Sequence, residues 1–419
     1  MNNSTVPISD IKARILYNSR GSQCVEIDVY SDESIGRTSS PAGASTGKYE
    51  APSFLNNEIE QSLSEFHKYK DQLIGLDCTD SIAMTEKLHE IDGTENYKKI
   101  GGSFAYAISI ASIDCAANST KIPFYKILTG DSCRMPRPLG NVLGGGMHAG
   151  EGSTDIQEFL SYPKGASNIR ECINANLLVH KNIKNLVSKS DSNFSGGKGD
   201  EGAWAPNLSN DEALNVVHEA TTMASDTLGF EILFGLDVAS SSLWKEKDQI
   251  YDYSREGKKR NSEDQISYMS ELIDKYDLCY VEDPLHEEAF DDFADLMKKT
   301  NTLVVGDDLL VTNAKILQKS IEKHSCNAGI LKVNQAGSLG DALDFAKTAN
   351  DNNISIITSH RSGDTVDPHI AHIAIATNSV MIKSGVVGGE RNSKLNELLR
   401  IDELSFISEG TSMPLIEKI

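Results

Sequence analysis

Short apolar runs that end in a charged residue recur through the last two-thirds of the chain, and helical patterns lie between them. Such runs are typical of buried strands in a parallel sheet. They cover residues 232–236, 278–281, 303–306, 329–331, 354–358 and 380–382. The alternation predicts a β/α barrel of the TIM type over residues 131–419, with the charged residues gathered on the rim where such barrels hold their active sites.

The first 130 residues follow a different pattern, in which strands come before helices. Residues 25–29 alternate apolar and acidic side chains, as expected of an antiparallel sheet with one half-exposed face. This order predicts an α+β domain at residues 1–130, with the junction marked by Pro136 and Pro138. The predicted strands cover residues 11–17, 24–30 and 35–40, and the predicted helices cover residues 57–75, 80–91 and 103–119.

A loop of small residues, 41–49, separates the third predicted strand from the first helix. Its segment Gly43-Ala44-Ser45-Thr46-Gly47-Lys48 is not a P-loop, because only three residues separate the glycines and Tyr49 stands where a Ser or Thr would hold Mg²⁺. On turn chemistry alone, a flexible linker and a mobile lid are both acceptable interpretations. In a lid, the small residues permit large backbone changes, and Ser45 or Thr46 could reach a ligand.

Composition and charge narrow the class of protein. Hydrophobic residues make up 39% of the 419 residues, and no run approaches the ~20 apolar residues that a membrane-spanning helix needs. The net charge of −21 disfavours nucleic acid and anionic lipid as partners, and it requires a locally positive pocket for any anionic substrate. The polar start, residues 1–7, predicts no secretory leader. Seven cysteines without Cys-x-x-Cys spacing indicate reduced thiols in the cytoplasm and argue against a zinc site.

Three carboxylates follow successive predicted strands: Asp237, Glu282 and Asp307. A single strand-end Asp is more often a helix cap than a metal ligand. Three converging carboxylates, however, would repel one another without a cation, and all-oxygen ligation suits Mg²⁺ before Ca²⁺ or Mn²⁺. We therefore expect a Mg²⁺ site, with the neighbouring Asp283 and Asp308 as caps or as partners of the ligands.

Two lysines, Lys332 and Lys383, follow apolar residues inside predicted strands, where lysine is rare unless it is paired or functional. A metal and a second cation nearby would lower the pKa of such a lysine and make it a general base near neutral pH. The plainer alternative is that each lysine buries its aliphatic stem and extends its ammonium group to the solvent at the barrel mouth. The segment His360-Arg361-Ser362 adds a forked donor and a hydroxyl, which together suit a phosphate group.

Other polar positions are less specific on their own. They are Glu201 in the glycine-rich loop 196–202, Gln157 and Glu158 at the start of a predicted strand, and His148 after three glycines. The loop could equally be a surface turn, and a lone histidine is ambiguous. His369 and His372 follow Pro368 at a spacing of i,i+3, and we interpret them as helix surface or core rather than as ligands.

These segments together resemble the enolase family, nearly end to end, from Ala13-Arg14 to Leu399-Arg400-Ile401. The resemblance is carried by residues 43–47, 92–94, 199–202, 306–309, 311–313, 332–335 and 359–363. It implies an α/β fold in which an α+β N-terminal domain caps an enolase-type β/α barrel, and the first turns of that barrel depart from simple βα alternation. It also implies the glycolytic and gluconeogenic reaction of the family, the reversible Mg²⁺-dependent conversion of 2-phospho-D-glycerate to phosphoenolpyruvate and water.

The resemblance further implies roles for single residues. Lys332 takes the proton from C2 of the substrate, and Glu201, with Glu158 nearby, protonates the departing C3 hydroxyl. The implied ligands of a first Mg²⁺ are Asp237, Glu282 and Asp307, and Ser45 helps to bind a second Mg²⁺ that arrives with the substrate. The implied substrate-binding residues are Ala44, Ser45, His148, Gln157, His360, Arg361, Ser362 and Lys383.

Charges that resemble family interface residues, Arg20, Glu26 and Arg400, imply a homodimer, and further association into octamers is left open. Two other functions stay open as alternatives. One is a relative that removes an α-proton from a different carboxylic acid, which the phosphate-binding pair Arg361-Ser362 disfavours. The other is a homologue with a binding role, in which Lys332 or Glu201 would be expected to have been lost.

Overall fold

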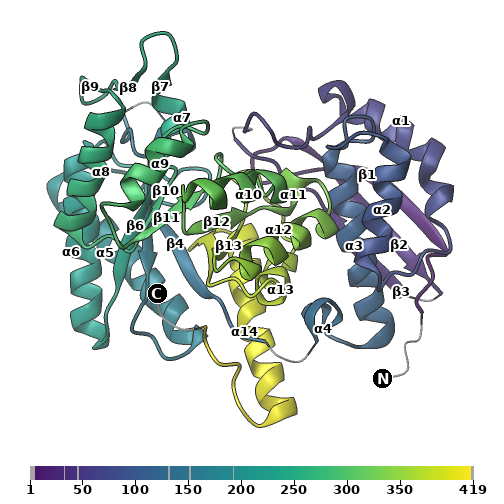
Figure 1. Ribbon diagram of the computed structural model, residues 1–419. Helices are drawn as coiled ribbons and strands as arrows, with labels where there is room; N and C mark the ends of the chain where they lie inside the picture. The colour runs from purple at the N-terminus through teal and green to yellow at the C-terminus, as the bar shows by residue number, and fades with distance from the viewer. Residues whose placement is uncertain are drawn as a thin grey trace.

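The computed structural model describes residues 5–32, 34–44, 47–130, 133–150, 152–191 and 193–416, which form two parts that lie side by side in Figure 1. The N-terminal part is a three-stranded antiparallel sheet in the order β1-β2-β3, covered by helices. Its strands are β1 (Asp10–Tyr17), β2 (Gln23–Ser31) and β3 (Ser34–Ser39). Its helices are η1 (Leu55–Asn57), α1 (Ile59–Tyr69), η2 (Lys70–Leu73), α2 (Ser81–Asp92), α3 (Gly102–Thr120) and α4 (Phe124–Thr129).

The central strand β2 is buried on both faces, whereas its alternating sequence predicted one half-exposed face. Val25, Ile27 and Val29 belong to the core that includes α3. The acidic face is covered because Arg14 pairs with Glu26 and Asp28 from the neighbouring strand β1. Burial alone would raise the pKa of Asp28, but the arginines that bond it lower that pKa to about 2. Paired charges therefore take the place of solvent on this face.

Eight strands close into a barrel in the order β4-β5-β6-β10-β11-β12-β13-β14. Strand β5 runs antiparallel to both of its neighbours, and the other pairs are parallel. This confirms the predicted TIM-like barrel with irregular first turns. The strands are β4 (Arg137–Gly144), β5 (Glu158–Tyr162), β6 (Leu233–Asp237), β10 (Tyr280–Glu282), β11 (Leu303–Gly306), β12 (Ala328–Leu331), β13 (Ser355–Ser359) and β14 (Met381–Gly385).

Helices surround the barrel, and many begin at a side-chain cap. Ser209 and Glu212 form a capping box at α6, and Asn313 accepts two backbone N–H groups at α10. The helices are η3 (Gly146–His148), α5 (Ile169–Ser190), α6 (Asn210–Leu228), α7 (Ser240–Leu243), α8 (Ser262–Tyr276), α9 (Phe290–Met297), α10 (Ala314–Lys323), α11 (Val333–Ala336), α12 (Leu339–Asp351), α13 (His369–Ala376) and α14 (Gly389–Glu409).

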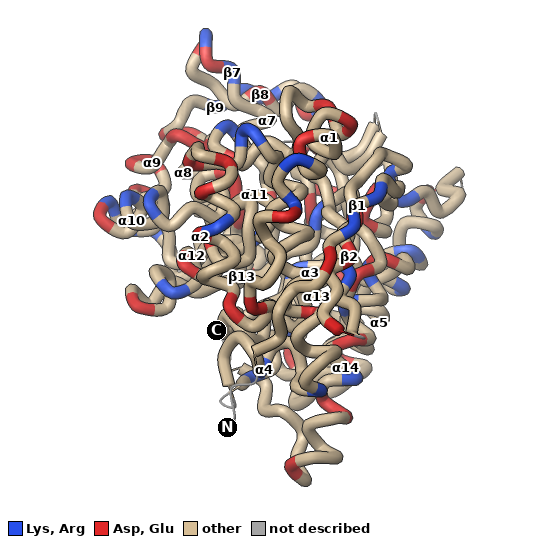
Figure 2. Tube along the Cα trace, turned by 90° about the vertical axis from the view of Figure 1, so that its right-hand side faces the viewer, with Lys and Arg blue, Asp and Glu red and all other residues tan. Residues whose placement is uncertain are grey.

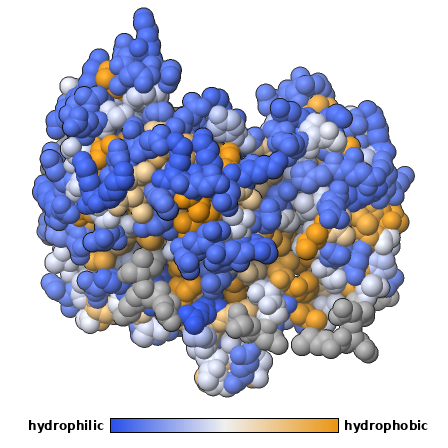
Figure 3. Space-filling model, viewed as in Figure 1, coloured by the Kyte–Doolittle hydropathy of each residue, from blue (hydrophilic) through white to orange (hydrophobic). Residues whose placement is uncertain are grey.

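A small sheet interrupts the βα rhythm after β6. It consists of β7 (Trp244–Lys245), β8 (Ile250–Tyr253) and β9 (Lys258–Arg260), and it stands at the top left of Figure 1. Over the surface, acidic and basic positions are interspersed (Figure 2), and the face seen in Figure 3 is mostly hydrophilic with small apolar areas. Among the described residues, no helix combines the length and apolarity that crossing a membrane would take.

Candidate active site

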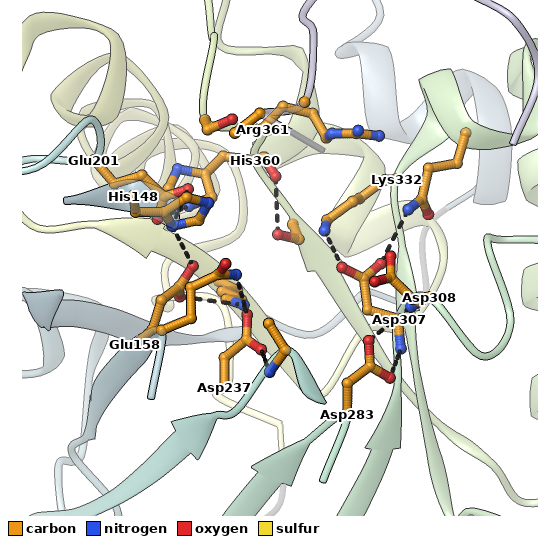
Figure 4. Close-up of a pocket in the computed structure, with 18 of the residues that line it drawn as sticks. His148, Glu158, Glu201, Asp237, Asp283, Asp307, Asp308, Lys332, His360 and Arg361 are labelled. Carbon is orange, nitrogen blue, oxygen red and sulfur yellow. Dashed lines mark hydrogen bonds and ion pairs between the residues drawn. The ribbon is translucent and has the colours of Figure 1, made fainter. Parts of the chain in front are cut away.

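A polar cavity lies at the rim of the barrel, beside the loop that leaves the N-terminal sheet (Figure 4). Twelve of the predicted catalytic, substrate-binding and metal-binding residues line it, together with Asp283 and Asp308: Ala44, His148, Gln157, Glu158, Glu201, Asp237, Asp307, Lys332, His360, Arg361, Ser362 and Lys383. Glu282 is fully buried beside Asp237, and Ser45 lies outside the described residues. The strand-end charges predicted from the sequence therefore face one space.

One wall of the cavity is a row of three carboxylates on neighbouring strands. Glu158 on β5, Asp237 on β6 and Glu282 on β10 stand next to one another in strand register. Lys383 reaches them from β14, across the barrel interior: its Nζ lies 3.2 Å from Glu158 Oε2, 2.8 Å from Asp237 Oδ2 and 2.6 Å from Glu282 Oε2. Glu282 Oε1 is buried and has no hydrogen-bond partner.

The opposite wall is formed around Asp307, directly after β11. Asp307 pairs with Lys332 and accepts a hydrogen bond from Gln335 Nε2 at 3.1 Å. Asp283 accepts the backbone N–H groups of Asp307 at 3.0 Å and of Asp308 at 2.8 Å. Oxygens of these three aspartates lie within 4.8 Å of one another. Asp283 thus holds the turn that carries Asp307, which agrees with the expectation of a partner to a ligand.

The three carboxylates expected to hold a cation are therefore divided between two lysines. Lys383 binds Asp237 and Glu282, whereas Lys332 binds Asp307. The physical reason is charge balance, because buried carboxylates without a partner are costly and an ammonium group is the nearest positive charge.

The charges at this site favour a cation. Burial, together with the neighbouring carboxylates, raises the pKa of Asp237 and of Glu282 despite Lys383. Burial and the charge of Asp307 raise the pKa of Asp308 to about 7. A divalent cation would relieve this repulsion and supply a partner for the orphaned Glu282 Oε1. The all-oxygen donor set fits Mg²⁺.

The pKa of Lys332 is set by its contact with Asp307. Burial and the cations of Arg361 and Lys383 lower it, but Asp307 outweighs them and the pKa is raised. The same ion pair overcomes the effect of burial on Asp307 and lowers the pKa of that carboxyl. The sequence-based expectation of a lowered lysine pKa supposed a metal ion beside the ammonium group, and it stays a prediction for the metal-bound protein.

A second cluster joins two carboxylates and two histidines. His148 Nδ1 lies 3.1 Å from Glu158 Oε1 and 3.7 Å from Glu201 Oε1, and His360 Nε2 lies 3.0 Å from Glu201 Oε2. Asn141 Nδ2 donates to Glu201 Oε2 at 3.0 Å. All four ionisable side chains are largely buried. Four groups that can bind a proton therefore lie together where solvent cannot stabilise their charges.

The histidines of this cluster hold different charges. Burial would lower the pKa of His148, but Glu201 and Glu158 outweigh it and raise that pKa to about 9. Burial lowers the pKa of His360, so its ring is neutral at pH 7. Because His360 Nδ1 lies 2.7 Å from the guanidinium of Arg391, a donor without a lone pair, we assign its ring proton to Nε2, facing Glu201. The two histidines hold Glu201 ionised and lower its pKa although it is buried.

The loop that carries Glu201 returns to the barrel from the end of α5. The N–H of Gly144 donates to Trp204 O at 2.9 Å, and the N–H of Trp204 donates to Val142 O at 3.3 Å, so the loop extends the end of β4. Trp204 Nε1 donates to His180 O at 2.8 Å, and the two rings stack with centroids 4.6 Å apart. An aromatic contact behind the loop thus fixes the position of Glu201.

Arg361 and Ser362 leave β13 at the cavity mouth and are held from behind by a buried arginine. Arg391 of α14 is fully buried and donates to Arg361 O at 2.6 Å and to Ser362 O at 2.8 Å. These bonds hold the backbone of this segment, and the Arg361 side chain lines the cavity (Figure 4). Ser362 Oγ is buried without a hydrogen-bond partner, which leaves it available to an anion.

The loop 41–49 contacts the barrel both before and after residues 45 and 46. Ala42 and Gly363 exchange two backbone hydrogen bonds of 2.8 and 2.9 Å. Beyond the tip, Lys48 Nζ lies 2.8 Å from Glu288 Oε1, and Tyr49 donates its hydroxyl to the same oxygen at 3.1 Å. Ser45 and Thr46 lie outside the described residues.

Sequence reasoning missed several residues of the cavity wall. They are Gly43, Glu50, Ala239, Gln335 and Ser359, together with Asn141 behind Glu201. None follows the pattern of a charge at a strand end. Glu50 could have been found as an acidic residue next to a loop of small residues, but nothing in the sequence tells that it contacts Arg361.

The remaining charged candidates do not line the cavity. On α13, His369 lies 3.6 Å from Asp114 and His372 lies 3.2 Å from Glu397, as core and helix contacts. Arg20 pairs with Asp200, and Arg400 pairs with Glu397. These family-like interface charges thus have partners within the chain, and the homodimer stays a prediction.

A β/α barrel with an antiparallel second strand and a rim of buried carboxylates and lysines defines a class of metal-assisted barrel enzymes. Family models identify the branch of that class. "Enolase, N-terminal domain" matches residues 8–128, and "Enolase, C-terminal TIM barrel domain" matches residues 132–410. The chain therefore belongs to the enolase family.

Individual relatives agree over nearly the whole length. A protein named enolase from Methanosphaera stadtmanae is 47% identical over 400 residues, which are 94% of this chain and 97% of the relative. Another from Methanothermobacter thermautotrophicus is 42% identical over 411 residues, 97% of this chain and 99% of the relative. A third from Archaeoglobus fulgidus is 43% identical over 401 residues, with 95% and 97% covered.

Proposed function

We propose that the protein catalyses the reversible dehydration of 2-phospho-D-glycerate to phosphoenolpyruvate and water, as a hydro-lyase of glycolysis and gluconeogenesis. The observation that carries this proposal is that Lys332 faces the cavity opposite Glu201 and His148 (Figure 4). A base and an acid on opposite sides of a substrate suit an anti elimination, in which a proton and a hydroxyl leave from opposite faces. Membership of the enolase family supports the same reaction.

The proposed cofactor is Mg²⁺, with two ions per site. Asp237, Glu282 and Asp307 would hold the first ion, and Ser45 would contribute to a second that arrives with the substrate. When bound, the ions supply the concentrated positive charge that removal of a very weakly acidic proton beside a carboxylate requires. The buried, partly unpartnered carboxylates are what supports this assignment.

Lys332 would take the proton from C2. A general base must be neutral before it accepts a proton, and the ion pair with Asp307 opposes this by raising the pKa of Lys332. If Asp307 were a ligand of Mg²⁺, Lys332 would lose that contact, and the nearby cations of Arg361 and Lys383 would favour its neutral form. Lys383 would then be released from the carboxylate row and could orient the substrate carboxylate.

The departing C3 hydroxyl would receive its proton from the cluster of Glu201, Glu158 and His148. His148 carries a proton at neutral pH and touches both carboxylates, so the proton can move onto Glu201 as the hydroxyl approaches. His360 holds Glu201 in place through the proton on Nε2. The cluster would therefore deliver one proton at a defined place instead of relying on solvent.

Arg361 and Ser362 would bind the phosphate group, the first through its charged fork and the second through its unpartnered hydroxyl. His360 precedes them on the same segment, and Gln157 and Ala44 would complete the substrate contacts from β5 and the lid. Lys332, Lys383, Arg361 and protonated His148 face the cavity beside seven carboxylates, so the locally positive pocket that an anionic substrate needs would also require the bound Mg²⁺.

The first test is the ultraviolet absorbance of the purified protein with 2-phosphoglycerate, with Mg²⁺ and with excess chelator. A rise from phosphoenolpyruvate that requires Mg²⁺ supports the proposal. No rise from a folded, Mg²⁺-supplied protein would contradict it and favour a relative that acts on another carboxylic acid, or a binding role.

We also propose a homodimer in the cytoplasm, with functional domains at residues 1–130 and 131–419. No disulfide joins the seven cysteines, all of which lie in the described part of the chain, and this supports a reducing compartment. Light scattering on the protein as it elutes from a size-exclusion column should give twice the mass of the chain. A mass equal to one chain would contradict the dimer.

A further inference from the structure

Glu50 is a buried acid in the cavity wall that the proposed chemistry does not use. It directly follows the lid loop 41–49, its side chain is 6% exposed, and it forms an ion pair with Arg361, which is 5% exposed. A buried acid is costly to stability unless it is fully hydrogen-bonded, so the hydrogen-bond partners of Glu50 indicate its role.

Both oxygens of Glu50 are used. Oε1 accepts the backbone N–H of Gly47 at 2.9 Å and Nε2 of Gln335 at 3.2 Å. Oε2 accepts from Nη1 and from Nη2 of Arg361, each at 3.2 Å. Every group around this carboxylate is therefore a donor, and the carboxylate joins the lid backbone to the arginine.

Arg361 has other carboxylates to which it could turn. Asp307 and Asp308 also attract its charge, and with Glu50 they raise the pKa of the guanidinium above the value that burial alone would give. A guanidinium that moved to Asp307 would occupy the proposed metal site and leave the phosphate position. Glu50 holds the fork on the lid side of the cavity, away from those aspartates.

We propose that Glu50 is a positioning residue that holds Arg361 for the phosphate group of the substrate and ties that arginine to the backbone of loop 41–49 at Gly47. The proposal rests on the proposed function and deepens it. Glu50 acts through Arg361 and through the N–H of Gly47, and it takes no part in proton transfer. Its second neighbour, Gln335, also donates to Asp307 at 3.1 Å, so the same contacts connect the lid to the proposed metal site.

The variant that tests this is Glu50→Gln. In either orientation of the amide, its NH₂ group would face donors, either Gly47 N–H and Gln335 or the fork of Arg361. The variant must therefore lose either the hydrogen bonds to Gly47 and Gln335 or those to Arg361. Loss of a charge-assisted contact predicts a KM for 2-phosphoglycerate that rises about tenfold or more, with kcat changed by about threefold at most. Glu50→Asp keeps the charge and should restore part of the lost affinity.

The matched control is Glu288→Gln, which removes a carboxylate on the exposed side of the same loop, where it contacts Lys48 and Tyr49. Because that pair is half-exposed, the change in KM should stay within about twofold. An Arg361→Gln background gives the decisive comparison. If Glu50 acts through Arg361, Glu50→Gln should add little to the loss in that background.

Three results would overturn the inference. They are a KM for Glu50→Gln within about twofold of the parent, an effect that is fully additive with Arg361→Gln, or a fall in kcat at unchanged KM. If Glu50→Gln does not fold, the same comparison is made with Glu50→Asp, for which unchanged KM contradicts the proposal. If the parent protein does not turn over 2-phosphoglycerate, the proposed function fails. The role of Glu50 is then tested by calorimetry with inorganic phosphate, for which Glu50→Gln should weaken binding about tenfold or more.

Discussion

At the scale of single residues, the site is a set of buried charges that hold one another in place. Lys383 is bonded by three carboxylates, and Lys332 is bonded by one. In such pairs the attraction between the charges offsets the cost of removing them from water only when each charge is fully hydrogen-bonded. Each lysine therefore occupies a place that a metal ion could take over, and the exchange would free its ammonium group for the substrate.

Replacing Lys332 by Ala should abolish turnover while the protein stays folded. General-base catalysis contributes about 10²- to 10⁴-fold, and the loss should reach at least that range because no other lysine adjoins Asp307 among the contacts of the described residues. The measurement is phosphoenolpyruvate absorbance, with circular dichroism as the check on folding. The control is Lys298→Ala, an exposed lysine on the surface of the barrel. Turnover above about one-tenth of the parent rate would remove Lys332 from the role of base.

Asp307→Asn should weaken Mg²⁺ binding. The amide removes one negative charge from the proposed ligand set, and disturbing even the partners of metal ligands typically costs about 10- to 100-fold in affinity. Calorimetric titration with Mg²⁺ measures this, with the exposed Asp295→Asn as the matched control. Equal affinities in the two variants would count against Asp307 as a ligand.

The sequence could predict these residues because a charge at the end of a buried strand has few explanations. Twelve of the predicted residues line the cavity for that reason or because of the family resemblance. Glu50 could not be predicted, since its partner Arg361 is 311 positions away and neither stands in a repeating pattern. Protonation states were also beyond the sequence, because they depend on contacts such as the one between Asp307 and Lys332, which raises the pKa of the lysine.

At the scale of elements, the periodic patterns were reliable where both faces of a strand meet apolar neighbours. Strands β6, β10 and β11 lie where the apolar runs placed them. The sheet β7-β8-β9 was not predicted, because its strands are only two to four residues long and too short to show a period. The exposed face expected for β2 was wrong, because paired arginines from its neighbours cover it.

The contact between β3 and α3 gives a prediction for the N-terminal part. A Cβ atom at Gly36 would lie 2.0 Å from Ala111 O and 2.1 Å from Cys115 N, so Gly36→Ala must push the strand and the helix backbone apart. Such overpacking should cost about 1–3 kcal/mol or more of unfolding free energy. The urea midpoint should fall, whereas Gly389→Ala, with no atom within 4 Å of the added methyl, should keep it. An unchanged midpoint for Gly36→Ala would contradict the close packing of this contact.

At the scale of the whole molecule, the two parts of the chain meet at the site and also at a second place. His89 Nε2 on α2 lies 2.9 Å from Asp341 Oδ1 on α12, and Tyr97 donates to Asp341 Oδ2 at 2.6 Å. Asp341 raises the pKa of His89 above its usual value despite burial. This contact stabilises the protein while His89 is protonated and is lost as the pH rises through the raised pKa.

The carboxylates of the site make stability depend on Mg²⁺ and pH together. The folded protein raises the pKa of Asp308 from 3.8 to about 7, and it also raises the pKa of Glu282. The folded state therefore binds these protons more tightly than the unfolded chain, and without a cation these groups cost stability as the pH rises towards 7 and beyond. A bound Mg²⁺ replaces the protons and removes that cost.

Mg²⁺ should consequently raise the melting temperature more at pH 8 than at pH 5.5, where protons compete for the same oxygens. At a concentration of 100 times Kd the stabilisation is about 2.7 kcal/mol, which differential scanning calorimetry resolves. The net charge of −21 means that any salt stabilises the chain by screening, so each comparison needs NaCl at matched ionic strength. Asp307→Asn should lose most of the Mg²⁺-specific shift. A shift that is equal at both pH values, or that NaCl reproduces, would show that the cation acts on the surface charge and not at the carboxylates of the barrel rim.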